Sequence, residues 1–164
     1  MKYLQSGLVL VAGVLGAASA TGHADHDLNK NHRKSEIREA IIRRFFKETR
    51  SPVEVYADQF IAEADAHRLD WRLLPSLAFV ESGGGQRNLR NNFFGWDNGT
   101  VRFSTATEAI HHVAEALAEA PAYKGKDLIG KLVAYNPNPG YWQLVKSVME
   151  RISPIVPVPI PDSL

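Results

Sequence analysis

Hydrophobic residues recur three or four positions apart over most of the chain, as they do on one face of an amphipathic helix. The first such segment, SEIREAIIRRFFKE (35–48), opens on a serine, which commonly caps a helix N-terminus. The second, residues 51–68, places Pro52 in its first turn, where proline is compatible with a helix. Asp70 is the predicted cap of a third helix that runs to about Ser82.

An irregular segment then interrupts the helices. Residues 83–104, GGGQRNLRNNFFGWDNGTVRFS, are rich in glycine and asparagine and contain one strand-like piece at residues 100–103.

Within the third helix, Pro75 falls late for a first-turn residue. The start of that helix is therefore expected to be kinked or displaced by a turn.

Helix resumes after this segment. TATEAIHHVAEALAEA begins with Thr105 and Glu108 in the T-x-x-E spacing of a capping box. Two shorter helices are predicted at residues 126–135 and 141–152, and the turn NPNPG (136–140) separates them. The fold class is therefore mainly α, a small helical bundle with a reduced, irregular β-lobe.

The N-terminus has the pattern of a secretory signal peptide, residues 1–20. A short basic start at Lys2 precedes an apolar run, and Ala18-Ser19-Ala20 provides an A-x-A cleavage site. The apolar run is shorter than the roughly 20 residues that span a bilayer, so no stable membrane span is expected after cleavage. Cleavage after Ala24 and an uncleaved anchor remain alternatives. We therefore expect a secreted or periplasmic protein.

The two ends of the mature chain are predicted to lie outside the fold. Residues 21–34 carry three histidines and no aromatic residue, which favours a disordered polar leader over a metal-binding tail. Residues 154–164 alternate proline with isoleucine and valine and are expected to be extended.

Composition limits the other possibilities. The 164 residues fit one globular domain, and the absence of cysteine excludes disulfides and thiolate metal sites. Without the first twenty residues the chain has 18 basic and 18 acidic residues. This balance provides no general attraction for nucleic acid or acidic membranes, so no nucleic-acid partner is expected.

Glu81 stands where the apolar third helix ends. Residues three, four and seven positions before it, Ala78, Leu77 and Leu74, share its helix face and are all apolar. An apolar setting and the helix C-terminus both disfavour the charged carboxylate, so they raise its pKa. A carboxylic acid that stays protonated near neutral pH can act as the general acid in glycoside cleavage. The alternatives are a salt-bridged glutamate or one that frays at the helix end.

Two features after Glu81 favour the catalytic interpretation. Gly83, Gly84 and Gly85 can cap the helix and also let the backbone pass close to a ligand. One glycine suffices for a cap, so three suggest that space is kept clear. The segment NNFFGW (91–96) combines amides, which suit sugar hydroxyls and N-acetyl groups, with aromatic faces that stack on sugar rings. A turn with buried aromatic residues is the alternative for this segment.

Four blocks between Asp70 and Ile152 resemble the lysozyme-like superfamily of peptidoglycan-cleaving enzymes, in its glucosaminidase-domain branch (similar to glycoside hydrolase family 73). LAFVESGGG (77–85) resembles the family's helix that ends in the catalytic Glu-Ser. NNFFGW is similar to its Asn-x-Phe-Gly segment, which lines the cleft. RFSTATEAI (102–110) resembles its Phe/Tyr-x-Ser-x-x-Glu-Ala entry into the next helix, and AYNPNPGYWQLVKSVM (134–149) its later tyrosine motif.

The resemblance implies a lysozyme-like glucosaminidase domain over residues 35–153. Glu81 then takes the general-acid role, with Tyr135 placed near it. The implied ligand is peptidoglycan or a chitooligosaccharide-like glycan, and no cofactor is implied. The predicted substrate-binding residues are Ser82, Asn91, Asn92, Phe94, Gly95, Trp96 and Asp97.

The chain departs from the family pattern in one place. Family hydrolases carry an extended β-lobe that supplies a second acidic group, whereas here only DNGTVR (97–102) separates NNFFGW from the next block. Asp97 is the one acidic residue in that short connection, and the resemblance does not equate it with the family's second acid. Single-glutamate chemistry, completed by the substrate's own N-acetyl or 6-hydroxyl group, remains possible.

No metal site is expected from the remaining motifs. His111 and His112 lie on a predicted helix, with Glu108 and Glu115 four positions from His112 and His111 respectively. Adjacent histidines on a helix point apart, unlike the pair in H-E-x-x-H.

The leading hypothesis is an exported hydrolase of peptidoglycan glycan strands, endo-β-N-acetylglucosaminidase-like. A single-glutamate lytic transglycosylase of the same fold and a non-catalytic peptidoglycan-binding module are the alternatives. A helical scaffold for envelope assembly is a further one, and no partner protein is implied.

Overall fold

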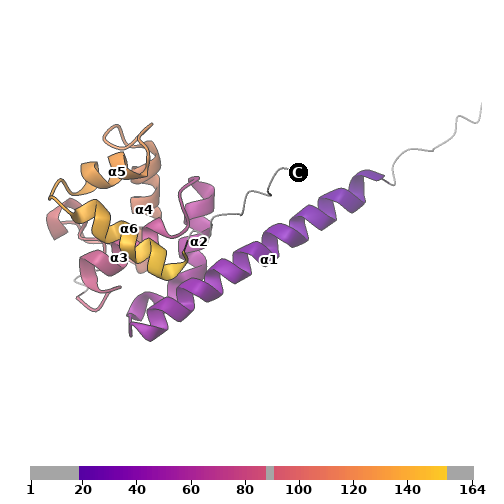
Figure 1. Ribbon diagram of the computed structural model, residues 1–164, viewed down its shortest axis with the longest axis horizontal. Coiled ribbons are helices and arrows are strands. Elements are labelled where there is room, and N and C mark those ends of the chain that lie inside the picture. The colour runs from indigo at the N-terminus through magenta and orange to yellow at the C-terminus, as the bar shows by residue number, and fades with distance from the viewer. Residues whose placement is uncertain (1–18, 88–90, 155–164) are drawn as a thin grey trace, which may run out of the picture. The chain divides into compact units, whose positions relative to one another are not determined.

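The computed structural model describes residues 19–87 and 91–154, with side chains from residue 28 onward. The predicted signal peptide and Pro-rich tail, apart from Ser19, Ala20 and Pro154, lie outside the described residues. The described residues form six α-helices and two 3-10 helices, and none of them belongs to a strand (Figure 1). The mainly α prediction is confirmed. The strand-like piece at residues 100–103 is instead irregular.

The helices follow one another with short connections. Their bounds are α1 Ser19–Glu48, η1 Pro52–Tyr56, α2 Ala57–Ala66, α3 Leu73–Ser82, η2 Trp96–Gly99, α4 Ala106–Glu119, α5 Leu128–Tyr135 and α6 Tyr141–Ile152. Over the described residues, no helix is both long enough and apolar enough to cross a membrane.

The chain divides into two compact units, residues 1–34 and residues 35–164. The described residues of the first unit belong to α1, which begins at Ser19 and not at Ser35. Residues 21–34, predicted to be a disordered leader, are therefore helical here. Their described side chains, residues 28–34, are all exposed. Burial of side chains thus does not explain this part of the helix. The spacing of apolar residues, which marks buried helix faces, therefore could not predict it.

The second unit has a core of aromatic and aliphatic side chains. Phe46 extends from α1 and meets Phe60 of α2, with ring centroids 5.7 Å apart, and Phe45 packs edge-on against Phe46 at 5.5 Å. Phe93 and Phe94, from the irregular segment, are also fully buried and approach Phe60 edge-on at 6.4 Å. The irregular segment is therefore anchored in the core by its two phenylalanines.

Helix α3 lies at the centre of this unit. Every residue from Leu73 to Ala78 is buried, and the helix contacts α2, α4 and α6. The helix begins at Leu73 with Arg72 at the N-cap position, so the prediction of Asp70 as the cap is wrong. Because the start lies later than predicted, Pro75 falls within the first turn and no kink is needed. Just before it, the Arg72 guanidinium binds Asp70 through two hydrogen bonds of 2.6 and 2.9 Å and the Ser153 carbonyl at 2.9 Å. These bonds tie the start of α3 to the end of α6.

Helices α4 and α6 start where the sequence predicts them, whereas α5 starts at Leu128, two residues after the predicted position 126. The Thr105 cap is confirmed, because its hydroxyl accepts from the Glu108 amide. The Glu108 carboxylate accepts from the amide of Ser104, one residue before the cap position of the predicted capping box. Helix α5 is capped by Asp127, whose carboxylate accepts from the Gly130 amide. Helix α6 has the predicted bounds 141–152.

The glycines after α3 make a tight turn. Gly83 ends the helix in the left-handed region, and the Gly83 and Gly84 amides donate to the carbonyls of Phe79 and Ala78. A Cβ added to Gly84 would lie 2.6 Å from the Ser51 side chain. The expectation that all three glycines keep space clear for a ligand is therefore wrong for Gly84, which makes room for the loop before η1.

Replacing Gly84 is expected to destabilise the protein for two separable reasons. Gly84→Ala combines a positive φ of 66° with the clash against Ser51. Gly125→Ala is the matched control, since Gly125 has a φ of 74° and no atom within 4 Å of an added Cβ. We expect urea denaturation to show Gly125→Ala losing about 1–2 kcal/mol. Gly84→Ala should lose about 1–3 kcal/mol more. Equal losses would mean that the contact with Ser51 relaxes freely.

Candidate functional site

Glu81 projects from the C-terminal end of α3 into an open cavity of about 830 Å³. Small-molecule sites typically fall between about 300 and 1,000 Å³. The wall combines aromatic rings, uncharged amides and small residues. Its residues are Glu81, Gly95, Trp96, Asp97, Asn98, Gly99, Val101, Tyr123, Tyr135, Asn136, Pro137 and Asn138.

The Glu81 carboxyl has a raised pKa, as its sequence position predicted. Burial is the largest cause, and the hydrogen bond from Tyr141 and the charge of Arg87 act in the opposite direction. The helix neighbours Leu74, Leu77 and Ala78 are fully buried. Glu81 itself is half-buried and has no ion pair with a basic side chain among the described residues. It can therefore hold a proton and still reach a ligand.

Tyr141 is the residue that contacts the Glu81 carboxyl. Its hydroxyl donates to Glu81 Oε1 at 2.5 Å from the first residue of α6. Burial, followed by the hydrogen bond to Glu81, raises the pKa of Tyr141, so it stays a protonated donor. Tyr141 is not among the predicted site residues, although it lies in the same segment as Tyr135, residues 134–149.

Tyr135 lines the cavity, but its hydroxyl is hydrogen-bonded to the backbone and not to Glu81. The hydroxyl donates to the Phe94 carbonyl at 2.6 Å, and the ring stacks on Tyr141 with centroids 6.1 Å apart. Burial, and then the nearby Glu81 carboxylate, raise the pKa of Tyr135 well above its usual range. Tyr135 therefore lies near Glu81 as predicted, and it also fixes the loop that carries Gly95.

Gly95 brings the backbone of the irregular segment against Glu81. It has a φ of 63°, and a Cβ added to it would lie 3.0 Å from Glu81 Oε2. A side chain at this position would crowd the carboxylate. The structure thus shows a close backbone approach to Glu81 at Gly95, a residue for which the sequence predicted substrate binding and not this contact.

Asn92 holds the same segment together from inside. Its side-chain oxygen accepts from the Trp96 amide at 2.8 Å, and its NH₂ group donates to the carbonyls of Trp96 and Val101, each at 3.0 Å. Only 7% of Asn92 is exposed. Its amide is therefore occupied by the backbone and orients Trp96 and Val101, which do line the cavity.

Trp96 is the large aromatic residue of the wall. It is half-buried, and its ring lies 5.8 Å from Tyr135 and 6.1 Å from Tyr123 between centroids. His112 of α4 meets the same ring edge-on at 5.5 Å. Trp96 is thus held by aromatic neighbours on several sides, which leaves a partly exposed face at the cavity.

Lys131 fixes the segment that carries Tyr123. Its ammonium donates to the carbonyl of Leu117 at 2.6 Å and to that of Tyr123 at 2.9 Å. These bonds join α5 to the last turn of α4 and to the connection that follows it. The two hydrogen bonds therefore stabilise the connection that carries Tyr123.

The predicted site residues fall into two groups. Glu81, Gly95, Trp96, Asp97 and Tyr135 line the cavity. The others serve the fold: the Ser82 hydroxyl bonds backbone groups of residues 78, 85 and 93, and the Asn91 amide donates to the carbonyls of Phe103 and Ser104. Phe94 is fully buried. The sequence did not predict four further polar residues of the wall, Asn98, Tyr123, Asn136 and Asn138. Asn136 and Asn138 lie in the NPNPG segment, for which the sequence predicts only a turn.

Asp97 is the second acidic residue of the cavity wall. It is exposed, and its carboxylate accepts a hydrogen bond of 2.7 Å from the Thr100 hydroxyl. No contact between Asp97 and Glu81 is found among the described residues. The geometry thus provides one partly buried acid beside the loop and one solvated carboxylate at the rim.

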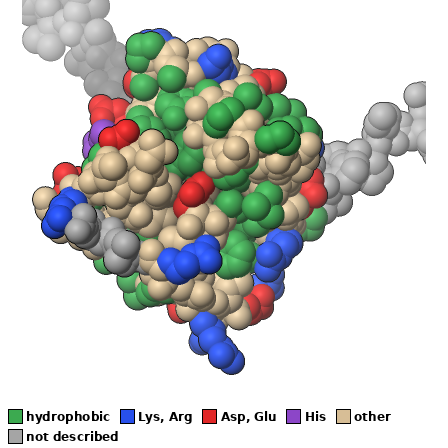
Figure 2. Space-filling view, turned by 90° about the vertical axis from the view of Figure 1, so that its left-hand side faces the viewer, with side chains coloured by type: hydrophobic (Ala, Val, Ile, Leu, Met, Phe, Trp, Pro, Cys, Tyr) green, Lys and Arg blue, Asp and Glu red, His purple; other side chains and the backbone are tan. Residues whose placement is uncertain are grey.

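The surface of the molecule varies in chemistry. On the face drawn in Figure 2, hydrophobic side chains cover broad areas and the basic side chains stand in separate groups. The cavity wall contains no lysine, arginine or histidine among the described residues. Its chemistry matches an uncharged ligand with hydroxyl and amide groups better than a polyanion.

Comparisons with family models, with curated proteins and with solved structures find no significant match to this chain.

The hydrogen bond from Tyr141 gives a direct prediction for the Glu81 pKa. A donor to the charged form lowers a pKa, so Tyr141→Phe should raise the Glu81 pKa further above its usual value. Tyr135→Phe is the matched control, because it removes a hydroxyl bonded to the Phe94 carbonyl. Carbon-detected NMR titration of the Glu81 carboxyl is the measurement. An unchanged or lower pKa in Tyr141→Phe would contradict the assignment.

Proposed function

We propose that this protein is an exported enzyme that cleaves the β-1,4 glycan strand of peptidoglycan, with Glu81 as general acid. The observation that carries the proposal is the Glu81 carboxyl, half-buried at the end of an apolar helix, with a raised pKa and facing a cavity. Export is supported by the signal-peptide pattern of residues 1–20.

Glu81 supplies the proton for the bond that breaks. Its carboxyl protonates the glycosidic oxygen while the bond from that oxygen to the anomeric carbon cleaves, and the glutamate is left as a carboxylate. The Tyr141 hydroxyl then stabilises the carboxylate by donating to Oε1. A water molecule or a group of the substrate itself adds to the anomeric carbon.

The wall of the cavity suits a glycan. Trp96, Tyr123 and Tyr135 offer aromatic faces to the apolar faces of sugar rings. Asn98, Asn136 and Asn138 offer amides that both donate to and accept from hydroxyl and N-acetyl groups. The mixture of rings and amides therefore favours a polymer of N-acetylated sugars.

A single-glutamate lytic transglycosylase is the second candidate. The observation in its favour is that Asp97, the other acidic residue of the wall, is exposed and hydrogen-bonded to Thr100. In that reaction the 6-hydroxyl group of the substrate attacks the anomeric carbon and an anhydro sugar forms, so no second carboxylate is required. Mass spectrometry of digested muropeptides separates the two, because hydrolysis leaves a reducing end.

Glu81→Gln should abolish clearing of peptidoglycan in a zymogram that the wild-type protein clears, because an amide cannot donate the proton. The variant should fold. Since the folded-state pKa of Glu81 is raised, wild-type stability falls as pH rises from the unfolded-state value through the folded-state value. Glu81→Gln has no carboxyl to ionise and does not lose this stability. Its free energy of unfolding relative to that of the wild-type protein should therefore increase as the pH rises between the two pKa values.

Asp97→Asn is the matched variant for the same zymogram and should retain clearing under the single-acid mechanism. Clearing by Glu81→Gln would overturn the catalytic proposal. Binding to peptidoglycan without clearing by either the wild-type protein or Glu81→Gln would instead identify a non-catalytic binding module.

Trp96 should contribute to binding even when the chemistry is switched off. In a Glu81→Gln background, Trp96→Ala should weaken binding to chitooligosaccharide by roughly 1–3 kcal/mol, the scale of one buried aromatic contact. Trp142→Ala is the control, since Trp142 is half-buried on α6 and does not line the cavity. Calorimetric titration is the measurement. Equal affinity for Trp96→Ala and its parent would remove Trp96 from the binding surface.

A further inference from the structure

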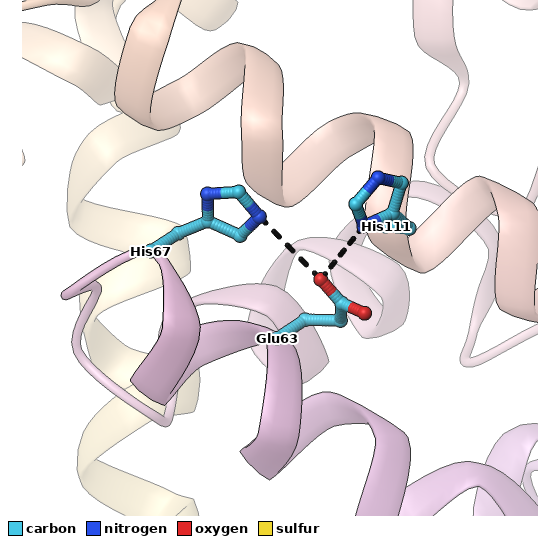
Figure 3. A group of neighbouring side chains, drawn as sticks. All are labelled: Glu63, His67 and His111. Atoms are coloured by element: carbon cyan, nitrogen blue, oxygen red, sulfur yellow. Dashed lines mark hydrogen bonds and ion pairs between the residues drawn. The ribbon is translucent and has the colours of Figure 1, made fainter.

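Three potential metal ligands meet between α2 and α4, away from the wall of the Glu81 cavity. Glu63 and His67 lie one turn apart on and just after α2, and His111 comes from α4. Figure 3 shows both imidazole rings turned toward the same carboxylate oxygen. Glu63 Oε2 lies 2.9 Å from His111 Nδ1 and 3.5 Å from His67 Nε2.

The spacing of these atoms is close to that of a tetrahedral metal site. Bonds of about 2.0–2.2 Å separate the ligand atoms of a tetrahedral zinc ion by roughly 3.3–3.6 Å. All three ligand atoms here lie within 4.8 Å of one another. The widest separation can close by rotation of His111, whose side chain is 55% exposed. Only a small adjustment is therefore needed to surround an ion.

The carboxylate of this cluster is already oriented. Gln59, one turn earlier on α2, donates to Glu63 Oε1 at 2.9 Å and leaves Oε2 for the histidines. The side chains of Glu63 and His67 are only 14% and 18% exposed, so the protein restricts their motion. Second-shell hydrogen bonds of this kind hold metal ligands in position. Glu115 adds negative charge near His111, which favours a cation.

We propose that Glu63, His67 and His111 bind a divalent transition-metal ion, with Zn²⁺ as the best fit. Two imidazoles and one carboxylate are a donor set of zinc sites, and the exposure of His111 leaves a fourth position for water. The ion would join α2 to α4. This site is independent of the proposed glycan cleavage. The sequence predicted no metal site, because that prediction paired His111 only with residues of its own helix. Glu63 and His67 come from α2 and its end.

The test measures Zn²⁺ binding to the full mature chain by calorimetry, with Mg²⁺ as the oxygen-preferring control ion. Because His23, His26 and His32 can also bind zinc, the parent protein carries all three as glutamine. In that parent we expect one equivalent of Zn²⁺ to bind and to raise Tm by a few degrees, with no response to Mg²⁺.

Single substitutions then assign the site. His67→Gln and His111→Gln should each weaken binding by more than about tenfold, and Gln59→Ala by about tenfold through its effect on Glu63. His112→Gln is the matched control, since His112 packs against Trp96 and Phe103 and should bind like the parent. Because the His111 side chain is 55% exposed, His111→Gln is expected to fold like the parent, and the Tm of the metal-free variant checks this.

Two results would overturn the proposal. A parent protein that binds no Zn²⁺ at about tenfold excess would mean that the three residues are an ion-pair cluster only. Equal affinity in the parent and in both His67→Gln and His111→Gln would place the bound zinc elsewhere on the chain. Co²⁺ gives an independent readout, because its visible absorption in the parent should show four-coordinate binding and should be lost in His111→Gln.

Discussion

The burial of α3 is the constraint on which the rest of the second unit depends. The helix is buried on all sides from Leu73 to Ala78, with Ser76 as the one polar residue of that stretch, so it must be covered by other elements, and α2, α4 and α6 contact it. Its covered length ends near Glu81, where the aromatic residues of the irregular segment enter the core. A carboxyl at that place is held between apolar packing and solvent. The same packing that stabilises the bundle thus raises the Glu81 pKa.

Local patterns in the sequence predicted much of this arrangement. The bounds of α6, the helix cap at Thr105 and the apolar face of Glu81 follow from spacing along one helix, because helical periodicity alone decides which residues share a face. The site beyond Glu81 was harder to predict. Asn92 was expected to bind substrate, yet its amide reaches backbone groups four and nine residues away. Spacing does not reveal which carbonyl an amide will meet in an irregular segment.

Tertiary pairing explains the other differences. Tyr135 and Tyr141 lie in one block, and only the packing of α6 against α3 decides that Tyr141 bonds Glu81. In the same way, the i,i+4 spacing of Glu63 and His67 is visible in the sequence, but His111 joins them from α4. The helical residues 21–34 differ for the opposite reason. Their described side chains are exposed, so no burial pattern could mark them.

The turn that precedes α6 has a thermodynamic consequence. Asn136, Pro137 and Asn138 line the cavity, and Tyr141, three residues after Asn138, donates its hydroxyl to Glu81. A ligand that pulls this turn away from Glu81 removes the donor that stabilises the carboxylate, so the proton is held more tightly. By linkage, a proton on Glu81 would strengthen binding of such a ligand by the same factor. Binding of a ligand at the turn and protonation of Glu81 would then favour each other.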